Sequence, residues 1–270
     1  MKHIERLEGE QRCDATKYRG IIGALLFISR ATRPDIETAV HMCACASKQP
    51  KIDHMRVAKR ILRYLVTTND LCMTYDANAA GAVVTGYCDS DWGSREQDSR
   101  SRSGYCLRIG SETSTSAVAM YKSRLQKTPA LSTAAAEYMA ASDCCSEVYD
   151  MRENLKVFGS RNLVTRAGTT RFTTVYSDSK SATTQAQEPK VHHKTKSIRT
   201  RYHHIRSLVQ RGPDKIIRLV YINTHDNPAD LFTKILPKKK FILFRNLLMN
   251  INPRTQKYRA HFMRSRVGTR

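Results

Sequence analysis

The stretch GAVVTGYCD, residues 81–89, decides the fold class because it has the composition of a strand and ends in a carboxylate. β-Branched and aromatic side chains, which favour strands, make up much of it. A polar loop follows, and then two more strand-like stretches over residues 103–109 and 116–123. The pattern therefore predicts a sheet that opens with three antiparallel strands.

Downstream of these strands the pattern alternates between helix and strand. A long helix is expected over residues 134–158, followed by a strand over 171–177. Another helix is expected over residues 197–210, then a strand over 216–222 and a last helix over 227–249. This order predicts an α/β fold in which helices flank a mixed five-stranded sheet.

Upstream of the sheet the pattern is helical. Residues 21–28 and 35–45 are apolar helical pieces separated by Arg33 and Pro34. Residues 54–65 form a clearer amphipathic helix, with apolar residues on one side and basic residues on the other. We therefore expect a small helical segment before the α/β domain.

The composition is strongly basic. The 270 residues include 46 Lys and Arg against 24 Asp and Glu, which gives a net charge of +22. Such an excess favours a polyanionic partner, because cationic side chains that neutralise phosphates release condensed counterions. A well-solvated basic surface is the alternative interpretation. The hydrophobic fraction of 40% is sufficient for a folded core.

Neither a membrane span nor a disulfide framework is expected. The longest apolar run, near residues 21–28, is too short to cross a bilayer. None of the eight cysteines forms a CxxC pair, and no signal peptide precedes them, so reduced thiols are predicted. We expect an intracellular protein with no membrane partner.

Four carboxylates fall at the ends of the predicted elements. Asp89 ends the first strand and Asp178 the fourth, while Glu137 and Asp230 lie in first turns of helices. The carboxyl edge of an α/β sheet and its loops gather functional groups. Hard oxygen ligands select Mg²⁺ or Mn²⁺, and two such ions about 4 Å apart can hold both reacting oxygens of a phosphodiester. The constellation predicts a metal-dependent phosphodiesterase.

Eight sequence blocks, in order, resemble the C-terminal part of Pol polyproteins from copia-type LTR retrotransposons. They are YRGIIGALLFISRATRPDI, HMRVAKRILRYL, GYCDSDWGS, SRSGYCL, ALSTAAAEYMAA, YSDSKSA, HHKTKSIRTRYHHIR and NPADLFTKIL. The resemblance covers the chain from about Tyr18 to about Leu248. It implies the end of the reverse transcriptase region followed by a domain with the ribonuclease H-like fold.

The resemblance also implies a division into four parts. Residues 1–17 form a poorly patterned N-terminal segment, and residues 18–76 a helical remnant of the reverse transcriptase connection. Residues 77–250 form the ribonuclease H-like domain. Residues 251–270 form a basic tail, expected to be disordered and to act as an electrostatic arm for nucleic acid.

The family's metal-binding carboxylates match Asp89, Glu137, Asp178 and Asp230, which are therefore the expected catalytic residues, with two Mg²⁺ or Mn²⁺ ions as cofactors. Asp91 lies two residues beyond Asp89 and is a secondary candidate.

Three features depart from the family pattern. Ala135 stands where the family usually has an acidic residue, and Ser197 and Arg199 replace a His and an Asp. The YxDD motif of the polymerase is also absent, so this chain cannot polymerise by itself.

Further polar residues are weaker candidates. His225 could shuttle protons near Asp230, but a loop residue without a role is the favoured interpretation. Trp92 could stack on a sugar or base, although core packing is favoured. Four histidines are expected to be solvated or to contact phosphate instead of binding zinc: His192, His193, His203 and His204. The basic candidates for nucleic-acid contact are Lys122, Arg124, Lys180, Lys194, Lys196 and Arg201.

Three functions remain open at this point. The preferred hypothesis is a ribonuclease that cuts the RNA strand of an RNA–DNA hybrid, with the reverse transcriptase and integrase parts of the same polyprotein as further partners. It places the protein in the cytoplasm, within a virus-like particle, or in the nucleus. The alternative is a catalytically decayed, nucleic-acid-binding remnant. A DNA nuclease or integrase of the same fold is a third, less favoured hypothesis.

Overall fold

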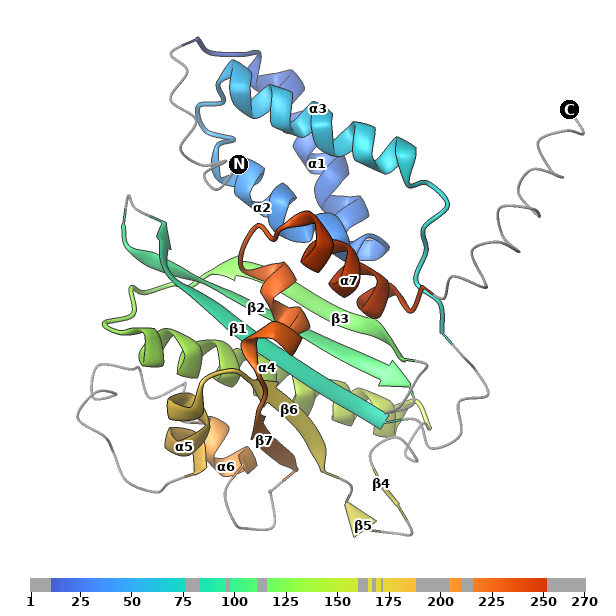
Figure 1. Cartoon of the computed structure of the whole chain (residues 1–270), viewed down its shortest axis with the longest axis vertical. Coiled ribbons are helices and arrows are strands. Elements are labelled where there is room, and N and C mark those ends of the chain that lie inside the picture. The colour runs from blue at the N-terminus through green and yellow to red at the C-terminus, as the bar shows by residue number, and fades with distance from the viewer. Residues whose placement is uncertain are drawn as a thin grey trace, which may run out of the picture. The chain divides into compact units, whose positions relative to one another are not determined.

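The computed structural model describes residues 11–75, 83–95, 98–110, 116–159, 165–166, 169–170, 172–187, 204–209 and 216–251. The chain divides into two compact units, whose elements are labelled in Figure 1. The helical unit combines Met1–Tyr75 with Pro237–Arg270, and the sheet unit is Asp76–Leu236.

The helical unit is built from short helices around its own apolar core. Its elements are α1 (Ala15–Ala31), the 3₁₀ helix η2 (Pro34–Ile36), α2 (Glu37–Cys45), α3 (Ile52–Thr67) and α7 (Lys238–Met249). Asp14 caps α1, because its carboxylate accepts the backbone N–H groups of Thr16 and Lys17 at 2.9 and 3.1 Å. The buried core includes Tyr18, Ile22, Leu25, Val40, Cys43 and Ile61.

A buried ion pair joins the end of α3 to η2. The Arg33 guanidinium donates to both oxygens of Asp35, at 2.9 and 2.7 Å. Tyr64 donates its hydroxyl to Asp35 at 2.6 Å, and Arg33 also donates to the backbone oxygen and the hydroxyl of Thr68. The pair is thus enclosed by hydrogen bonds, as a buried charge requires.

The C-terminal helix corrects one expectation. A single helix was expected over residues 227–249, inside a domain of residues 77–250. The chain instead forms a short 3₁₀ helix, leaves helical conformation before Pro237, and begins α7 at Lys238. Proline disfavours helical conformation in the residue before it. α7 belongs to the helical unit, where Met249 accepts the backbone N–H of Thr74 at 3.0 Å.

The sheet unit begins with three long strands and a long helix. These are β1 (Val83–Arg95), β2 (Arg100–Gly110), β3 (Ser116–Leu125) and α4 (Thr133–Val157). Short elements follow: β4 (Thr165–Arg166), β5 (Thr169–Thr170), β6 (Thr173–Ser177), α5 (Lys180–Gln187), α6 (His204–Val209), β7 (Ile217–Tyr221), η6 (Thr224–Asp226) and η7 (Pro228–Phe232). Of the helix expected over residues 197–210, only α6 lies within the described residues.

The main sheet has the strand order β3-β2-β1-β6-β7. β1 pairs antiparallel with β2, and β2 antiparallel with β3, whereas β6 runs parallel to both β1 and β7. Three antiparallel strands followed by parallel crossover strands, with helices flanking the sheet, make a ribonuclease H-like α/β fold. The expected fold class is therefore confirmed. The small β4-β5 pair was not predicted.

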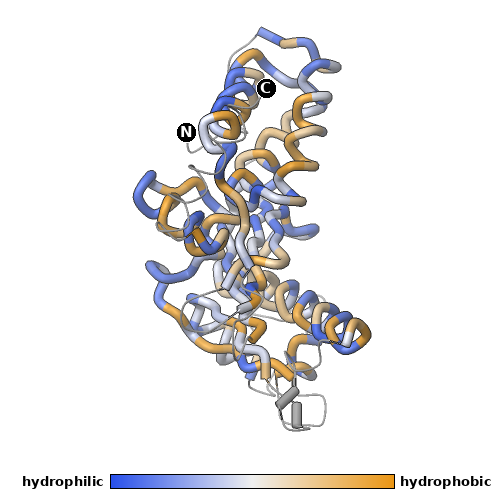
Figure 2. Tube along the Cα trace, turned by 90° about the vertical axis from the view of Figure 1, so that its right-hand side faces the viewer, coloured by the Kyte–Doolittle hydropathy of each residue, from blue (hydrophilic) through white to orange (hydrophobic). Residues whose placement is uncertain are grey.

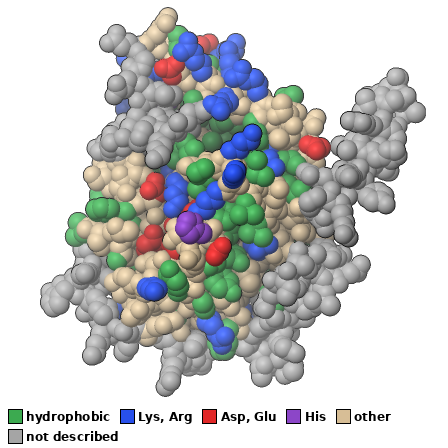
Figure 3. Space-filling model, in the orientation of Figure 1, with side chains coloured by type: hydrophobic (Ala, Val, Ile, Leu, Met, Phe, Trp, Pro, Cys, Tyr) green, Lys and Arg blue, Asp and Glu red, His purple; other side chains and the backbone are tan. Residues whose placement is uncertain are grey.

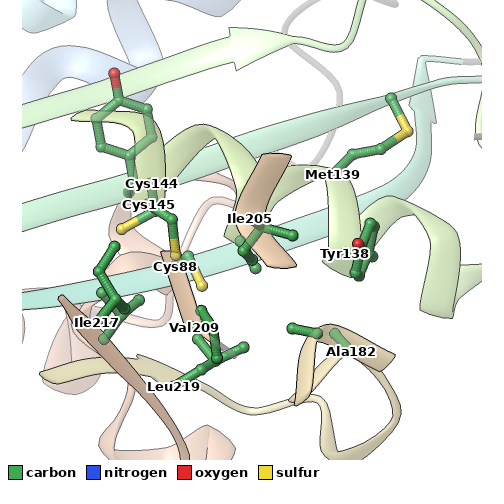
Figure 4. Close-up of a cluster of buried hydrophobic side chains, with 14 of the residues drawn as sticks. Cys88, Tyr138, Met139, Cys144, Cys145, Ala182, Ile205, Val209, Ile217 and Leu219 are labelled. Atoms are coloured by element: carbon green, nitrogen blue, oxygen red, sulfur yellow. The ribbon is translucent and has the colours of Figure 1, made fainter. Parts of the chain in front are cut away.

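Small side chains let α4 pack closely on one face of the sheet. Cys144 and Cys145 of α4 are buried against Cys88 of β1, and Ile217 and Leu219 of β7 complete this part of the core (Figure 4). Figure 1 shows α4 crossing behind β1 and β2. The same packing requires a glycine in β1. A Cβ atom at Gly86 would lie 3.0 Å from Val175 and 3.4 Å from the Cys144 sulfur.

The helices carry hydrophobic and hydrophilic residues in alternation along their length, as Figure 2 shows. None of the helices in the described part of the chain has the length and apolar character needed to cross a membrane.

Candidate metal centre

Three carboxylates meet at one edge of the sheet. β1 and β6 are neighbouring parallel strands in which Cys88 is in register with Ser177. The next residue of each strand path is an aspartate, Asp89 or Asp178, so the two side chains reach the same edge. Asp230 of η7 joins them, and one oxygen from each carboxylate lies within 4.8 Å of the other two. This geometry brings together three of the four expected site residues.

The position of Asp230 depends on how η7 is held against the sheet. Asn227 caps η7 by accepting the backbone N–H of Ala229 at 3.2 Å, and its amide donates to the Cys88 carbonyl at 2.9 Å. η7 also lies directly on Gly104 of β2. A Cβ atom at Gly104 would come within 2.7 Å of Phe232, so only glycine fits without displacing η7.

Glu137, the fourth expected ligand, is buried beside the other three. Ser132 caps α4 by accepting the backbone N–H of Ala135 at 3.2 Å, which fixes the start of the helix. The Glu137 Oε1 atom accepts the backbone N–H and the hydroxyl of Ser90, at 3.2 and 2.7 Å. Its Oε2 atom is buried and has no hydrogen-bond partner among the described residues. The side chain is only 6% exposed, so it does not point into solvent.

Two of the acidic residues at the centre, Asp89 and Glu137, are deeply buried. Burial raises the pKa of Asp89 to about 7, because the charge of Lys234 only partly offsets the loss of water and the repulsion from Asp230. Burial, and then the charge of Asp89, also hold the pKa of Glu137 well above its ordinary value. Burial thus disfavours the ionised form of these two carboxyl groups, and a bound cation would favour it.

Lys234 is the cation that faces these carboxylates. Its Nζ atom lies 2.7 Å from Asp230 Oδ1 and 3.5 Å from Asp89 Oδ2. Burial opposes its protonation, but the charges of Asp89 and Asp230 raise the pKa of Lys234 above its ordinary value. Thr233 donates its hydroxyl to Asp89 Oδ2. Lys234 thus places a positive charge beside the carboxylates of Asp89 and Asp230.

The donor set fits a hard divalent cation. All the converging atoms are carboxylate oxygens, which suit Mg²⁺ or Mn²⁺ better than softer metals. The unpartnered Oε2 of Glu137 is the second observation, since a buried carboxylate oxygen is normally satisfied. The residues present therefore fit the expected metal ions.

Other predicted site residues lie outside this group. Asp91 is half-buried in β1, and burial raises its pKa, but it is not one of the three converging carboxylates. His225 is exposed in η6. Trp92 was expected in the core, yet it is 51% exposed and donates its indole N–H to the Ala130 carbonyl at 3.0 Å. The expected core packing of Trp92 is therefore wrong, because half of the side chain remains exposed to solvent.

Among the basic candidates, two face the long helix. Lys122 lies 3.6 Å from Glu147, and Arg124 forms an ion pair with Asp143. Lys180 is exposed at the start of α5. The remaining three, Lys194, Lys196 and Arg201, lie outside the described residues.

Sequence reasoning missed the residues that position the centre. Lys234 lies one helical turn beyond Asp230, a spacing that could have indicated the ion pair. Ser90 lies between two aspartates, and its contact with Glu137 joins residues 47 positions apart. The contact of Asn227 with Cys88 joins residues 139 positions apart. A local sequence pattern cannot predict contacts between residues so far apart in the sequence.

Comparison with known proteins gives consistent relatives. The chain is 32% identical over 231 residues to a retrovirus-related Pol polyprotein from transposon TNT 1-94 of Nicotiana tabacum. It is 33% identical over 234 residues to the one from transposon RE1 of Arabidopsis thaliana. Each match covers 86% of this chain but only 16% and 15% of the relative, so the chain spans about a sixth of their length.

The other comparisons add little. No protein-family model matches the chain. The structure of a foamy viral protease-reverse transcriptase in complex with dsDNA is similar at a TM-score of 0.40 and 11% identity, over 82% of this chain and 40% of that one. Over 86% of its length, the chain is homologous to Pol polyproteins of copia-type retrotransposons.

Proposed function

We propose that this chain acts as a retrotransposon-type ribonuclease H, which hydrolyses the RNA strand of RNA–DNA hybrids with Mg²⁺ or Mn²⁺. The observation that carries the proposal is the convergence of Asp89, Asp178 and Asp230 within 4.8 Å. The similarity to retrovirus-related Pol polyproteins supports the choice of substrate, because the matching sequence blocks imply a ribonuclease H domain in this part of the chain.

The four carboxylates have separate tasks in this proposal. Asp89, Asp178 and Asp230 would hold the metal ions, and Glu137 would contribute its unpartnered oxygen. When bound, two such ions activate the attacking water and stabilise the leaving oxygen. Lys234, 2.7 Å from Asp230, would balance part of the carboxylate charge, and its half-exposed side chain would turn towards a substrate phosphate when the ions are bound.

Binding of the hybrid would rest on charge and on backbone shape. The net charge of +22 favours any nucleic acid, so charge alone does not select a hybrid. Recognition of the RNA strand by its 2′-hydroxyl groups, without reading of the base sequence, is the expected mode. The reverse transcriptase and integrase parts of a Pol polyprotein are the proposed protein partners.

A cleavage assay tests the proposal. The full chain is incubated with a hybrid labelled on its RNA strand, with Mg²⁺, Mn²⁺ or EDTA. We expect metal-dependent cleavage of the RNA strand only. Asp178→Asn should lower the rate at least about 100-fold, since metal ions contribute several kcal/mol to the transition state. Asp150→Asn, at an exposed position of α4, is the matched control and should cleave normally.

A second function has its own support. Lys234 already occupies a cation position in the centre, and the family's acidic residue is replaced by Ala135. A chain that binds nucleic acid without cutting it would fit these two features. Salt-sensitive binding with no cleavage under any metal would favour this non-catalytic function, and so would equal cleavage by Asp178→Asn and the wild type.

A further inference from the structure

A pair of tyrosines, one in β1 and one in β6, lies on the sheet beside the metal centre. Tyr87 lies two residues before Asp89, and Tyr176 two residues before Asp178. Alternate residues of a strand share a face, so Tyr87 lies on the same side of β1 as Asp89, and Tyr176, which stacks on Tyr87, shares that side. Tyr87 and Tyr176 are in register, and their rings stack with centroids 5.1 Å apart and an interplanar angle of 23°.

Farther from the metal centre, the same face of the sheet carries cationic and polar side chains. Thr174 is in register with Arg218 of β7, and the Arg218 guanidinium lies 5.9 Å from the centre of the Phe172 ring. On the other side of β1, Arg108 of β2 donates to the Ser116 carbonyl at 2.9 Å. We name this surface the outer sheet face, comprising Tyr87, Arg108, Phe172, Thr174, Tyr176 and Arg218.

The outer sheet face is accessible within the described part of the sheet unit. The helices α4, α5 and α6 contribute to the core on the opposite face, together with Cys88 and Val175. Phe172 and Arg218 are exposed, and the other four residues of the face are half-buried: Tyr87, Arg108, Thr174 and Tyr176. Figure 3 shows hydrophobic side chains grouped over the sheet, with Lys or Arg side chains close to them.

The chemistry of this face favours a nucleic acid with unpaired bases. Aromatic rings set among arginines provide stacking platforms for bases and cations for phosphates. Sheet surfaces that bind single strands use aromatic side chains in the same way. A base-paired duplex keeps its base faces stacked inside the helix and cannot use such rings. A purely apolar protein partner is disfavoured, because it would bury Arg108 and Arg218 without counter-charges.

We propose that the outer sheet face binds single-stranded nucleic acid leading away from the metal centre, with unpaired bases on Tyr87, Tyr176 and Phe172 and phosphates at Arg108 and Arg218. The carboxylate row and the tyrosine row are two residues apart along each strand, or about 6.6 Å. A strand held at the metal centre therefore reaches the tyrosines directly. This inference goes beyond the proposed hydrolysis of a hybrid, and it does not require cleavage.

Photocrosslinking of the unmodified chain tests the location. An RNA–DNA hybrid with a short single-stranded overhang carries 5-iodouridine either in the overhang or within the paired region. The full chain is irradiated with each in EDTA, so that no cleavage occurs, and crosslinked peptides are mapped. We expect overhang crosslinks in peptides that contain Tyr87, Tyr176 or Phe172. Overhang crosslinks confined to other peptides, or equal labelling of these peptides by the paired probe, would overturn the proposal.

A binding measurement tests the contribution of the face. The double variant Phe172→Ala, Arg218→Glu removes an exposed ring and reverses one charge. Lys156→Glu reverses one charge at the end of α4 and serves as the matched control. Fluorescence anisotropy in EDTA compares a labelled single-stranded oligonucleotide with a blunt hybrid, after thermal melting has verified that both variants are folded.

We expect the double variant to weaken single-strand binding about tenfold, the size of one lost base stack with its phosphate contact, and to leave the blunt hybrid nearly unchanged. Lys156→Glu should change neither. Equal weakening for both nucleic acids, or no weakening for the single strand, would contradict the proposal. Because these measurements need no metal, they remain decisive even if the cleavage assay shows no ribonuclease activity.

Discussion

Both units of the molecule contain buried carboxylates, but the partners of these carboxylates differ between the two units. In the helical unit, both oxygens of Asp35 accept hydrogen bonds from the Arg33 guanidinium, and Asp35 also accepts one from the Tyr64 hydroxyl. In the sheet unit, a single lysine, Lys234, faces both Asp89 and Asp230 at 3.5 and 2.7 Å. The protein supplies partners for both oxygens of Asp35, whereas beside Asp89 and Asp230 the Oε2 atom of Glu137 has no hydrogen-bond partner among the described residues.

The difference separates a structural ion pair from a site prepared for a ligand. Buried polar groups are normally hydrogen-bonded, so the unpartnered Oε2 of Glu137, next to three converging carboxylates, supports a further ligand at the centre. The helical unit also buries one unpartnered carboxylate oxygen, Glu37 Oε2, but no such group of carboxylates surrounds it within the described residues. The raised pKa values of Asp89 and Glu137 are consistent with this, because burial, followed by the charges of neighbouring carboxylates, disfavours ionisation until a cation binds.

The largest expected effect concerns the helical unit. Asp35→Ala leaves the Arg33 guanidinium buried without its counter-charge, and we expect a loss of about 3–5 kcal/mol in the free energy of unfolding. Asp53→Ala removes a partly exposed ion pair with Arg56 and should cost less than about 1 kcal/mol. Urea denaturation measures both. Equal losses would show that the Arg33 pair is not the structural element described above.

The opposite result is expected in the sheet unit. Asp230→Asn relieves repulsion from Asp89, so the free energy of unfolding without metal should stay level or rise. Hydrolysis of the hybrid should nevertheless fall at least about 100-fold, because a metal ligand is lost. Denaturation and cleavage rates are measured on the same preparation. A variant that unfolds more readily and still cleaves would remove the distinction between the two units.

A smaller effect is expected where η7 rests on the sheet. Gly104→Ala places a Cβ atom 2.7 Å from Phe232, and overpacking of this kind costs about 1–3 kcal/mol. Gly23→Ala, at an exposed position of α1 with no neighbouring atom within 4 Å, is the control and should be neutral or stabilising. Thermal melting compares them. Equal melting temperatures would show that η7 tolerates displacement.

The smallest expected effect is the change with pH in the thermal stabilisation that Mg²⁺ provides. The pKa of Asp89 is about 7 in the fold, against about 3.9 when unfolded. The group binds its proton more tightly in the fold, so its stabilising contribution is complete below about pH 4 and is lost as pH rises through 7.

Metal ions bind the deprotonated carboxylates, so Mg²⁺ should raise the melting temperature more at pH 8 than at pH 6. A metal concentration ten times the Kd contributes about 1.4 kcal/mol, or roughly 3–6 °C in melting temperature for a chain of this size. Differential scanning fluorimetry with Mg²⁺ and with NaCl of equal ionic strength measures the difference. A larger shift at pH 6 would contradict the coupling between metal binding and Asp89 ionisation.

The sequence was sufficient for the fold because its strands and helices have distinct periodicities. The expected strand over residues 216–222 is β7, Ile217–Tyr221, and the expected helix over residues 134–158 is α4, Thr133–Val157. It was not sufficient for the break before Pro237, which assigns α7 to the helical unit. The apolar spacing of α7 does not specify which core it enters.

The sequence predicts those site residues that lie at the ends of recognisable strands and helices. Asp89 and Asp178 follow strands that the sequence makes recognisable, and their convergence follows from parallel pairing. The roles of Ser90 and Asn227 depend on contacts between distant segments, which only the folded structure brings together. Asp230 was recognisable from its motif, although the helix expected around it is a single 3₁₀ turn.

The central claim is that the carboxylates form a centre for divalent cations. A crystal structure of the chain soaked in Mn²⁺, with anomalous difference maps, tests it most directly. We predict manganese about 2.1 Å from oxygens of Asp89, Asp178 and Asp230, with Lys234 turned away from the position it now holds. The absence of manganese at saturating concentration, with Lys234 still bound to Asp230, would contradict the account.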